Sequence, residues 1–153
     1  KEIACFTYLK RLSLMKSNLT GHIPKEIECL TFLKFLDLEC NQLTGKIPNE
    51  IGALINLTHL NLSNNNLTGH IPKNIGNLVN LIKLYLYKNK LSGFIPKEIA
   101  NLTNLKILSL NRNHLTGCIP PELQNLKKLE KLYLIENHLE RNVPTGLKSL
   151  IDV

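Results

Sequence analysis

The chain has 153 residues, 43% of them hydrophobic and 20% charged, which is the composition of a folded protein and not of a disordered segment. Its 32 leucines and 19 asparagines stand out, while tryptophan is absent, so a core built on large aromatic rings is not expected. The net charge of +7 favours acidic partners in general terms, but no nucleic-acid-binding motif accompanies it, and we do not expect nucleic acid as a partner. No stretch approaches the roughly 20 apolar residues that a membrane span needs.

A repeat with a constant period of 24 residues organises the chain. Proline recurs at this interval, at Pro24, Pro48, Pro72, Pro96, Pro120 and Pro144. The unit reads L-x-x-L-x-L-x-x-N-x-L-T-G-x-I-P-x-x-I-G-x-L-x-x. Six copies begin at Leu9, Leu33, Leu57, Leu81, Leu105 and Leu129, after a partial copy that contains Ile3 and Phe6. We therefore expect a single domain over residues 1–153, in which each repeat packs only on its neighbours.

Each part of the repeat, in chain order, predicts one short element. Alternating leucines such as Leu36 and Leu38 predict a strand with one buried face. The asparagine that follows can bond backbone groups in a tight turn, so its repetition predicts an asparagine ladder inside the solenoid. The glycine then permits a positive φ, and apolar residues spaced three apart after the proline predict a short 3₁₀ turn.

The segment L-T-G-x-I-P, as in residues 43–48 and 67–72, indicates which class of repeat this is. The repeat resembles that of the leucine-rich repeat family, and this segment resembles the family's plant-specific class. The resemblance implies an α/β fold: a right-handed solenoid with a parallel β-sheet on the concave face and short 3₁₀ segments on the convex face. A second short strand near Leu-Thr-Gly is also implied. Similar proteins include receptor-like kinase ectodomains, their co-receptors and polygalacturonase inhibitors.

Both ends depart from the repeat. Ser17 occupies the ladder position of the first repeat, and Glu140 with Arg141 replaces Thr-Gly in the last. Receptors of the resembled family carry cysteine-paired caps, and none is visible before Leu9, so we expect no clear caps. Terminal repeats of a solenoid are often atypical in this way.

Four cysteines need separate treatment. Cys5 and Cys29 share one repeat position in adjacent turns, so their Cα atoms should be near 5 Å apart, within disulfide range. Such a bond would staple the first turn, whereas buried or free thiols are the alternative. Cys40 and Cys118 lie at unrelated positions and are expected to be unpaired.

Function is expected in the residues that vary while the frame stays fixed. They flank the strand leucines and point outward from the concave face, where neighbours in a column lie about 5 Å apart. Phe35 with Met15 forms a smaller candidate patch, and other outward positions hold Ser63 and Ser109. Tyrosine and arginine often anchor interfaces, although a parallel sheet also favours aromatic and β-branched residues for its own sake. We predict these exposed ligand-binding residues: Lys83, Tyr85, Tyr87, Lys88, Ile107, Asn111, Arg112, Lys131, Tyr133 and Ile135.

Signs of catalysis and of metal binding are weak. No phosphate loop or nucleophile elbow is present, and Asp37 and Glu39, two apart on one strand, are interpreted as solvated charges. His114 and His138 occupy equivalent positions in adjacent turns, but no further ligand completes a metal site, so they are interpreted as surface histidines. We expect no enzyme activity, no cofactor and no metal.

Five N-x-S/T sequons, two of which the repeat generates by itself, suit a secreted protein. They begin at Asn18, Asn56, Asn61, Asn66 and Asn101. The leading hypothesis is a module that recognises a protein or peptide on its concave face, outside the cell or at its surface, as part of a larger protein. The alternative is a structural or scaffold repeat segment, a fragment or an engineered array, with no ligand of its own. An intracellular location is the alternative to the extracellular one.

Overall fold

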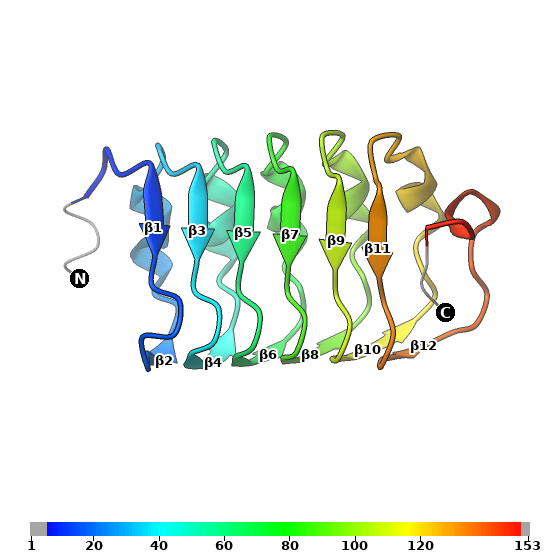
Figure 1. Cartoon of the computed structure of the whole chain (residues 1–153), viewed down its shortest axis with the longest axis horizontal. Helices are drawn as coiled ribbons and strands as arrows, with labels where there is room; N and C mark the ends of the chain where they lie inside the picture. The colour runs from blue at the N-terminus through cyan, green and yellow to red at the C-terminus, as the bar shows by residue number, and fades with distance from the viewer. Residues whose placement is uncertain (1–5, 151–153) are drawn as a thin grey trace.

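The computed structural model describes residues 6–150, which form two parallel six-stranded sheets and a series of 3₁₀ helices (Figure 1). The first sheet consists, in spatial order, of β1 (Arg11–Ser13), β3 (Phe35–Asp37), β5 (His59–Asn61), β7 (Lys83–Tyr85), β9 (Ile107–Ser109) and β11 (Lys131–Tyr133). The second consists of β2 (Thr20–His22), β4 (Gln42–Lys46), β6 (Asn66–Gly69), β8 (Lys90–Gly93), β10 (His114–Gly117) and β12 (His138–Leu139).

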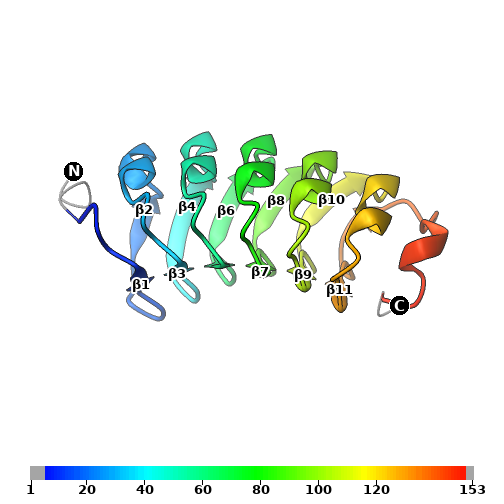
Figure 2. The ribbon, with the colours of Figure 1, turned by 90° about the horizontal axis from the view of Figure 1, so that it is seen from above.

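A 3₁₀ helix follows each second-sheet strand. These helices are η2 (Lys25–Cys29), η3 (Asn49–Ala53), η4 (Lys73–Asn77), η5 (Lys97–Asn101), η6 (Pro121–Asn125) and η7 (Thr145–Leu147). Seen from above, the ribbon is a gentle arc with the first sheet along its inner side and the helices along its outer side (Figure 2). The predicted leucine-rich repeat architecture is confirmed, including the second short strand in each repeat.

The strands of the first sheet keep equivalent repeat positions in register. Leu36 pairs with Leu60, and Leu60 pairs with Leu84. The residues on either side of each leucine follow the same alignment. Phe35, for example, stands beside His59, which stands beside Lys83. The concave face is therefore a set of columns, each of which samples one position of the repeat.

The interior is a continuous stack of leucine and isoleucine. Leu36, Leu60, Leu84 and Leu108 are completely buried, whereas Leu12 in the first repeat is only partly covered. Each fully buried leucine contributes about 1.5–3 kcal/mol relative to an exposed one. Because this stack runs from one repeat to the next, contacts between successive repeats contribute to the folding free energy along the whole solenoid.

The predicted asparagine ladder is present. Asn65 donates from Nδ2 to the carbonyl oxygens of Leu38 at 2.9 Å and Leu62 at 3.1 Å, and its Oδ1 accepts from the Leu43 amide at 3.0 Å. One side chain therefore satisfies backbone groups of two successive repeats. In the first repeat, Ser17 occupies the ladder position, and its backbone amide donates to Oδ1 of Asn41 in the next repeat at 3.0 Å. The neighbouring ladder asparagine therefore satisfies this backbone group.

The glycine at the L-T-G position, where the fourth repeat reads Leu91-Ser92-Gly93, is required by two features at once. Gly93 has a φ of +75°, and a methyl group there would overlap the imidazole of His70 from the preceding repeat. His70 holds this place because its Nδ1 contacts the Ser92 carbonyl oxygen at 3.1 Å. Gly21 has the same backbone conformation, but open space surrounds its Cα.

Candidate functional site

The structure brings the predicted ligand-binding residues together on the concave face of β7, β9 and β11 and in the turns that follow these strands. Their expected exposure is wrong in part. Ile135 is 45% exposed, but Tyr85, Tyr87, Tyr133 and Ile107 are only half-exposed. The reason is the close strand spacing of about 4.8 Å, which lets large side chains lean on their neighbours in the next repeat.

Tyr87 is tied to a residue two repeats away. Its hydroxyl donates to Glu39 Oε1 at 2.5 Å. Asn64 donates to the same oxygen at 3.1 Å, and Asn61 donates to Glu39 Oε2 at 3.0 Å. The predicted set omitted Glu39, Asn61 and Asn64, of which Glu39 and Asn64 contact the Tyr87 hydroxyl directly. A usable signal was the order of residues in one column, where an acid, a small residue and a tyrosine follow one another at Glu39, Ser63 and Tyr87.

Electrostatics make this bridge a contact between an ionised carboxylate and a neutral phenol. Burial raises the pKa of Glu39, but hydrogen bonds from Tyr87, Asn61 and Asn64 and the charge of Lys16 more than offset it, so the pKa lies below its ordinary value. Burial raises the pKa of Tyr87, and the hydrogen bond to Glu39 raises it further, to about 12. Both shifts keep Glu39 ionised and Tyr87 protonated at neutral pH, which are the protonation states that this hydrogen bond requires.

Two serines predicted on the outward face are buried instead. Tyr87 reaches from the β7 side of the sheet to Glu39 on the β3 side, so it passes over Ser63, which lies between them in the same column. The Ser63 hydroxyl has no hydrogen-bond partner within residues 6–150. Ser109 donates to Asn111 Oδ1 at 2.8 Å, so the predicted binding residue Asn111 also has an internal partner.

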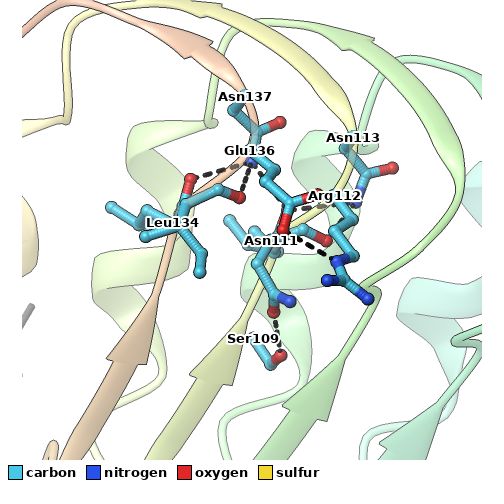
Figure 3. A network of polar contacts seen from close by, with 9 residues as sticks. Ser109, Asn111, Arg112, Asn113, Leu134, Glu136 and Asn137 are labelled. Carbon is cyan, nitrogen blue, oxygen red and sulfur yellow. Dashed lines mark hydrogen bonds and ion pairs between the residues drawn. The ribbon is translucent and has the colours of Figure 1, made fainter. Parts of the chain in front are cut away.

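Arg112 is neutralised by its neighbour. Its Nε contacts Glu136 Oε1 at 2.9 Å, across equivalent turns of adjacent repeats, just before the ladder residues Asn113 and Asn137 (Figure 3). In the described part of the chain, Lys83, Lys88 and Lys131 make no ion pair. The positive charge of the patch therefore resides in these three lysines rather than in Arg112.

The hydroxyls of Tyr85 and Tyr133 differ from that of Tyr87, because they have no hydrogen-bond partner among the described residues. Burial raises the pKa of Tyr85, with smaller contributions from Tyr133 and Glu39. Each ring thus offers apolar area and a free polar group at the same place, which is the chemistry of an interface anchor.

The smaller candidate patch has a different form from the prediction. The Arg11 guanidinium lies 3.6 Å from the centre of the Phe35 ring, whose other neighbour is His59 at 5.7 Å between ring centres. Met15, which belongs to the first repeat, is 42% exposed. Phe35 is therefore covered by two polar side chains and does not form an open apolar patch. Burial lowers the pKa of His59, and the charges of Lys83 and Arg11 lower it further.

A hollow of about 470 Å³ lies off the concave face, along the edge where the chain passes from the 3₁₀ helices to the first sheet. Its lining is an asparagine row with flanking lysines: Lys34, Asn56, Thr58, Asn80, Ile82, Asn104, Lys106 and Lys128. Asn56, Asn80 and Asn104 use their Nδ2 atoms to bond carbonyl oxygens of the preceding repeat. This row is a second, external ladder that holds the turns together.

The remaining sequence predictions have mixed outcomes. The rings of His114 and His138 stack at 6.0 Å, and residues 6–150 contain no group of three or more histidine, cysteine or acidic side chains arranged for a metal ion. Cys5 lies outside the described residues, but Cys29 is a free thiol in this structure, as are Cys40 and Cys118, so the structure agrees with the free-thiol alternative for Cys29. Among the described helices, none has the length and apolarity to cross a membrane.

Residues 1–143 match the family model described as a leucine-rich repeat region, and the chain belongs to the leucine-rich repeat family. It is 36% identical to the ectodomain of the Arabidopsis thaliana receptor kinase GASSHO1/SCHENGEN3, in complex with CASPARIAN STRIP INTEGRITY FACTOR 2, over 97% of this chain and 18% of that one, with a TM-score of 0.94. Neighbours of this kind confirm the resemblance to the plant-type class.

Two further solved structures are similar. One is the Arabidopsis receptor kinase HAESA in complex with the peptide hormone IDA and the co-receptor SERK1, at 36% identity over 97% of this chain and 25% of that one, with a TM-score of 0.92. The other is a plant ice-binding protein, at 35% identity over 93% and 46% of the two chains, with a TM-score of 0.83. The chain spans less than half of each of these three structures. Among curated proteins, none matches it.

Proposed function

We propose that this chain is a non-catalytic binding segment of an extracellular receptor-like ectodomain, and that it recognises a peptide or protein on the concave face of β7, β9 and β11. The observation that carries the proposal is the pair Tyr85 and Tyr133, whose half-exposed rings and unpartnered hydroxyls lie among lysines that have no ion-pair partner. Nothing in the repeat frame requires tyrosine or lysine at these positions.

The composition of the patch supports a protein or peptide ligand. Aromatic anchors supply most of the binding free energy in many interfaces, and unpaired lysines around them favour an acidic partner. The similarity to receptor ectodomains, one of them bound to a peptide hormone and a co-receptor, agrees with this choice. The ice-binding neighbour shows that the same repeat serves other functions, so the proposal depends on the site and not on the fold.

The sequons suit the proposed extracellular location, and the structure ranks them. Asn56 donates from Nδ2 to the Thr31 carbonyl oxygen at 2.8 Å, and Asn61 donates to Glu39 at 3.0 Å. A glycan on either amide would displace a hydrogen bond. Asn18 and Asn101 are exposed and make no such side-chain bond, so they are better acceptors.

The test is selection of a display library of random twelve-residue peptides on three immobilised proteins: wild type, a Tyr85→Ala/Tyr133→Ala variant and a Tyr8→Ala variant. Tyr8 is 80% exposed, precedes β1 and has its ring 5.3 Å from that of Phe32 instead of in the strands of the patch, so its variant is the control. We expect peptides enriched on wild type and on Tyr8→Ala, and lost on the double variant while its urea unfolding midpoint is nearly unchanged. Equal enrichment on all three proteins would contradict binding through Tyr85 and Tyr133, and no enrichment on wild type would favour the scaffold alternative.

A further inference from the structure

Charge is distributed unevenly along the concave face. The acidic residues Asp37 and Glu39 belong to β3 and the turn after it, and both are half-buried. The lysines without ion-pair partners, Lys83, Lys88 and Lys131, belong to the repeats of β7 and β11. One face therefore carries an acidic region and a basic region at separate places.

The two carboxylates have only uncharged partners. Glu39 accepts hydrogen bonds from a tyrosine hydroxyl and two asparagine amides, and Asp37 Oδ1 accepts from the backbone amide of Glu39 at 3.0 Å. No lysine or arginine in residues 6–150 forms an ion pair with either of them. The nearest cationic strand is β1, but its Arg11 is stacked on the Phe35 ring. Lys16 acts on Glu39 only through its charge.

A neutral strand separates the two regions. β5 and its turn present His59, Asn61, Ser63 and Asn64, and none of these carries a formal charge while His59 is neutral. Within this strip the Ser63 hydroxyl is fully buried beneath the Tyr87–Glu39 bridge and lacks a partner. A buried hydroxyl without a partner costs free energy, so the bridge leaves an unmet polar group next to a carboxylate that has hydrogen bonds but no ion-pair partner among the described residues.

We propose that the ligand is a dipolar peptide, in which a lysine or arginine is bound by Asp37 and Glu39 and an acidic residue is bound by Lys83 and Lys131. This inference rests on the proposed function of the concave face. It replaces the interpretation of Asp37 and Glu39 as simple solvated charges. The strand spacing sets the ligand geometry: β3 to β7 is about 10 Å and β3 to β11 about 19 Å, so an extended peptide places its opposite charges about three to six residues apart.

A purely structural role for Glu39 makes a different prediction. As a clamp between repeats, Glu39 needs only to accept hydrogen bonds, and a glutamine carbonyl oxygen can accept them as well. As a recognition residue it needs the negative charge. Replacement by glutamine therefore separates the two roles, since it keeps an acceptor and removes the charge.

The experiment uses the random twelve-residue peptide library on wild type and on three double variants. Asp37→Asn/Glu39→Gln removes the acidic region, and Lys83→Gln/Lys131→Gln removes the basic one. Glu26→Gln/Glu28→Gln is the control, because these two acids have the same spacing but lie on η2 at the convex face. Circular dichroism and urea unfolding of each variant identify any that fails to fold.

We expect wild-type selections to enrich peptides with a basic residue three to six positions from an acidic one, and the control to behave alike. Asp37→Asn/Glu39→Gln should lose the basic preference, with about tenfold weaker binding of the selected peptides, and keep the acidic preference. Lys83→Gln/Lys131→Gln should do the reverse. If enrichment requires Tyr85 and Tyr133 but shows no charge order, or if Asp37→Asn/Glu39→Gln keeps the basic preference, the dipolar ligand is wrong while the proposed function stands. If enrichment does not depend on the tyrosines, the proposed function itself fails.

Discussion

The interior ladder and the concave face use asparagine and tyrosine in opposite ways. Asn89 donates to the carbonyl oxygens of Leu62 and Leu86 and accepts from the Leu67 amide, so its partners are all backbone groups of the frame. Tyr85, on the concave face of the same repeat, has no hydrogen-bond partner within residues 6–150. The ladder holds successive repeats together, whereas the concave face leaves hydroxyl groups without a partner and thus available to a ligand.

Tyr87 lies between these two extremes. It is on the concave face, yet its hydroxyl bonds Glu39 and its ring covers Ser63. Exposure alone therefore does not separate residues that hold the repeats together from residues that can bind a ligand. Among the tyrosines, what distinguishes a binding residue is whether the protein already satisfies its hydroxyl, and by this criterion Tyr85 and Tyr133 are better candidates than Tyr87.

The largest effect is expected from Asn89→Ala. The substitution leaves backbone groups of two repeats buried without partners, and each costs about 1–3 kcal/mol, so we expect a loss of about 4 kcal/mol in the free energy of unfolding. Asn80→Ala is the control, since that residue is exposed and bonds only the Ile55 carbonyl oxygen, and it should cost about 1 kcal/mol. Urea unfolding measures both. Equal losses would show that the ladder carries no special share of the stability.

A smaller loss is expected from Gly93→Ala. The positive φ costs a non-glycine residue about 1–2 kcal/mol, and the new methyl group also displaces the His70 ring. Gly21→Ala has only the backbone cost, because nothing lies near its Cα. Thermal unfolding should therefore show Gly93→Ala to be the more destabilising by about 1 kcal/mol or more. Equal losses of stability for the two variants would mean that the His70 side chain packed against Gly93 does not restrict the residue at this position.

Tyr87→Phe should cost about 1 kcal/mol at neutral pH, because it removes a half-exposed hydrogen bond to a charged group. The folded state lowers the pKa of Glu39, so the associated stabilisation is present above about pH 4.5 and is lost as the pH falls through the folded-state pKa. The raised pKa of Tyr87 has the opposite sign: its contribution is present below pH 10 and is lost as the pH rises towards 12.

Stability against pH, compared between wild type and Tyr87→Phe, tests this account of the bridge. The variant should show a shallower decline at both extremes, and its ultraviolet absorbance should lack the phenolate transition near pH 12. Parallel stability curves for the two proteins would contradict the bridge.

The smallest effect is expected from Glu136→Gln. Its ion pair with Arg112 joins two side chains that are 56% and 55% exposed, and exposed pairs contribute between zero and about 1 kcal/mol. We expect a change of no more than about 0.5 kcal/mol in urea unfolding. A larger loss would mean that this turn, and not only the ladder beside it, holds the repeats together.

Most of the fold could be predicted from the sequence because the determinants are local and periodic. The leucines, the ladder asparagines and the L-T-G-x-I-P segment each specify a conformation within one repeat, and the constant interval places them beside their equivalents. The positive φ of the glycine is predicted in this way, whereas the positive φ of the residue before the ladder position recurs at the same interval from Lys16 to Glu136 on unrelated residue types and is not predicted.

The site could be predicted only in outline. The columns located Tyr85, Lys83 and Lys131 correctly on one face, but the burial of Ser63 and the pairing of Arg112 with Glu136 depend on which residues stand one or two repeats away. Such contacts are set by side-chain length and rotamer across columns, and a repeat pattern does not encode them. Reading each column as a sequence of neighbours recovers part of this information.

The most direct test of concave-face binding is chemical-shift mapping of the ¹⁵N-labelled chain with the most enriched library peptide. We predict that the perturbed amides cluster in β7, β9 and β11 and in the turns that follow them, with a second group near Glu39. The second sheet and the 3₁₀ helices should be unaffected. Perturbations confined to those elements, with none around Tyr85 and Tyr133, would contradict the account.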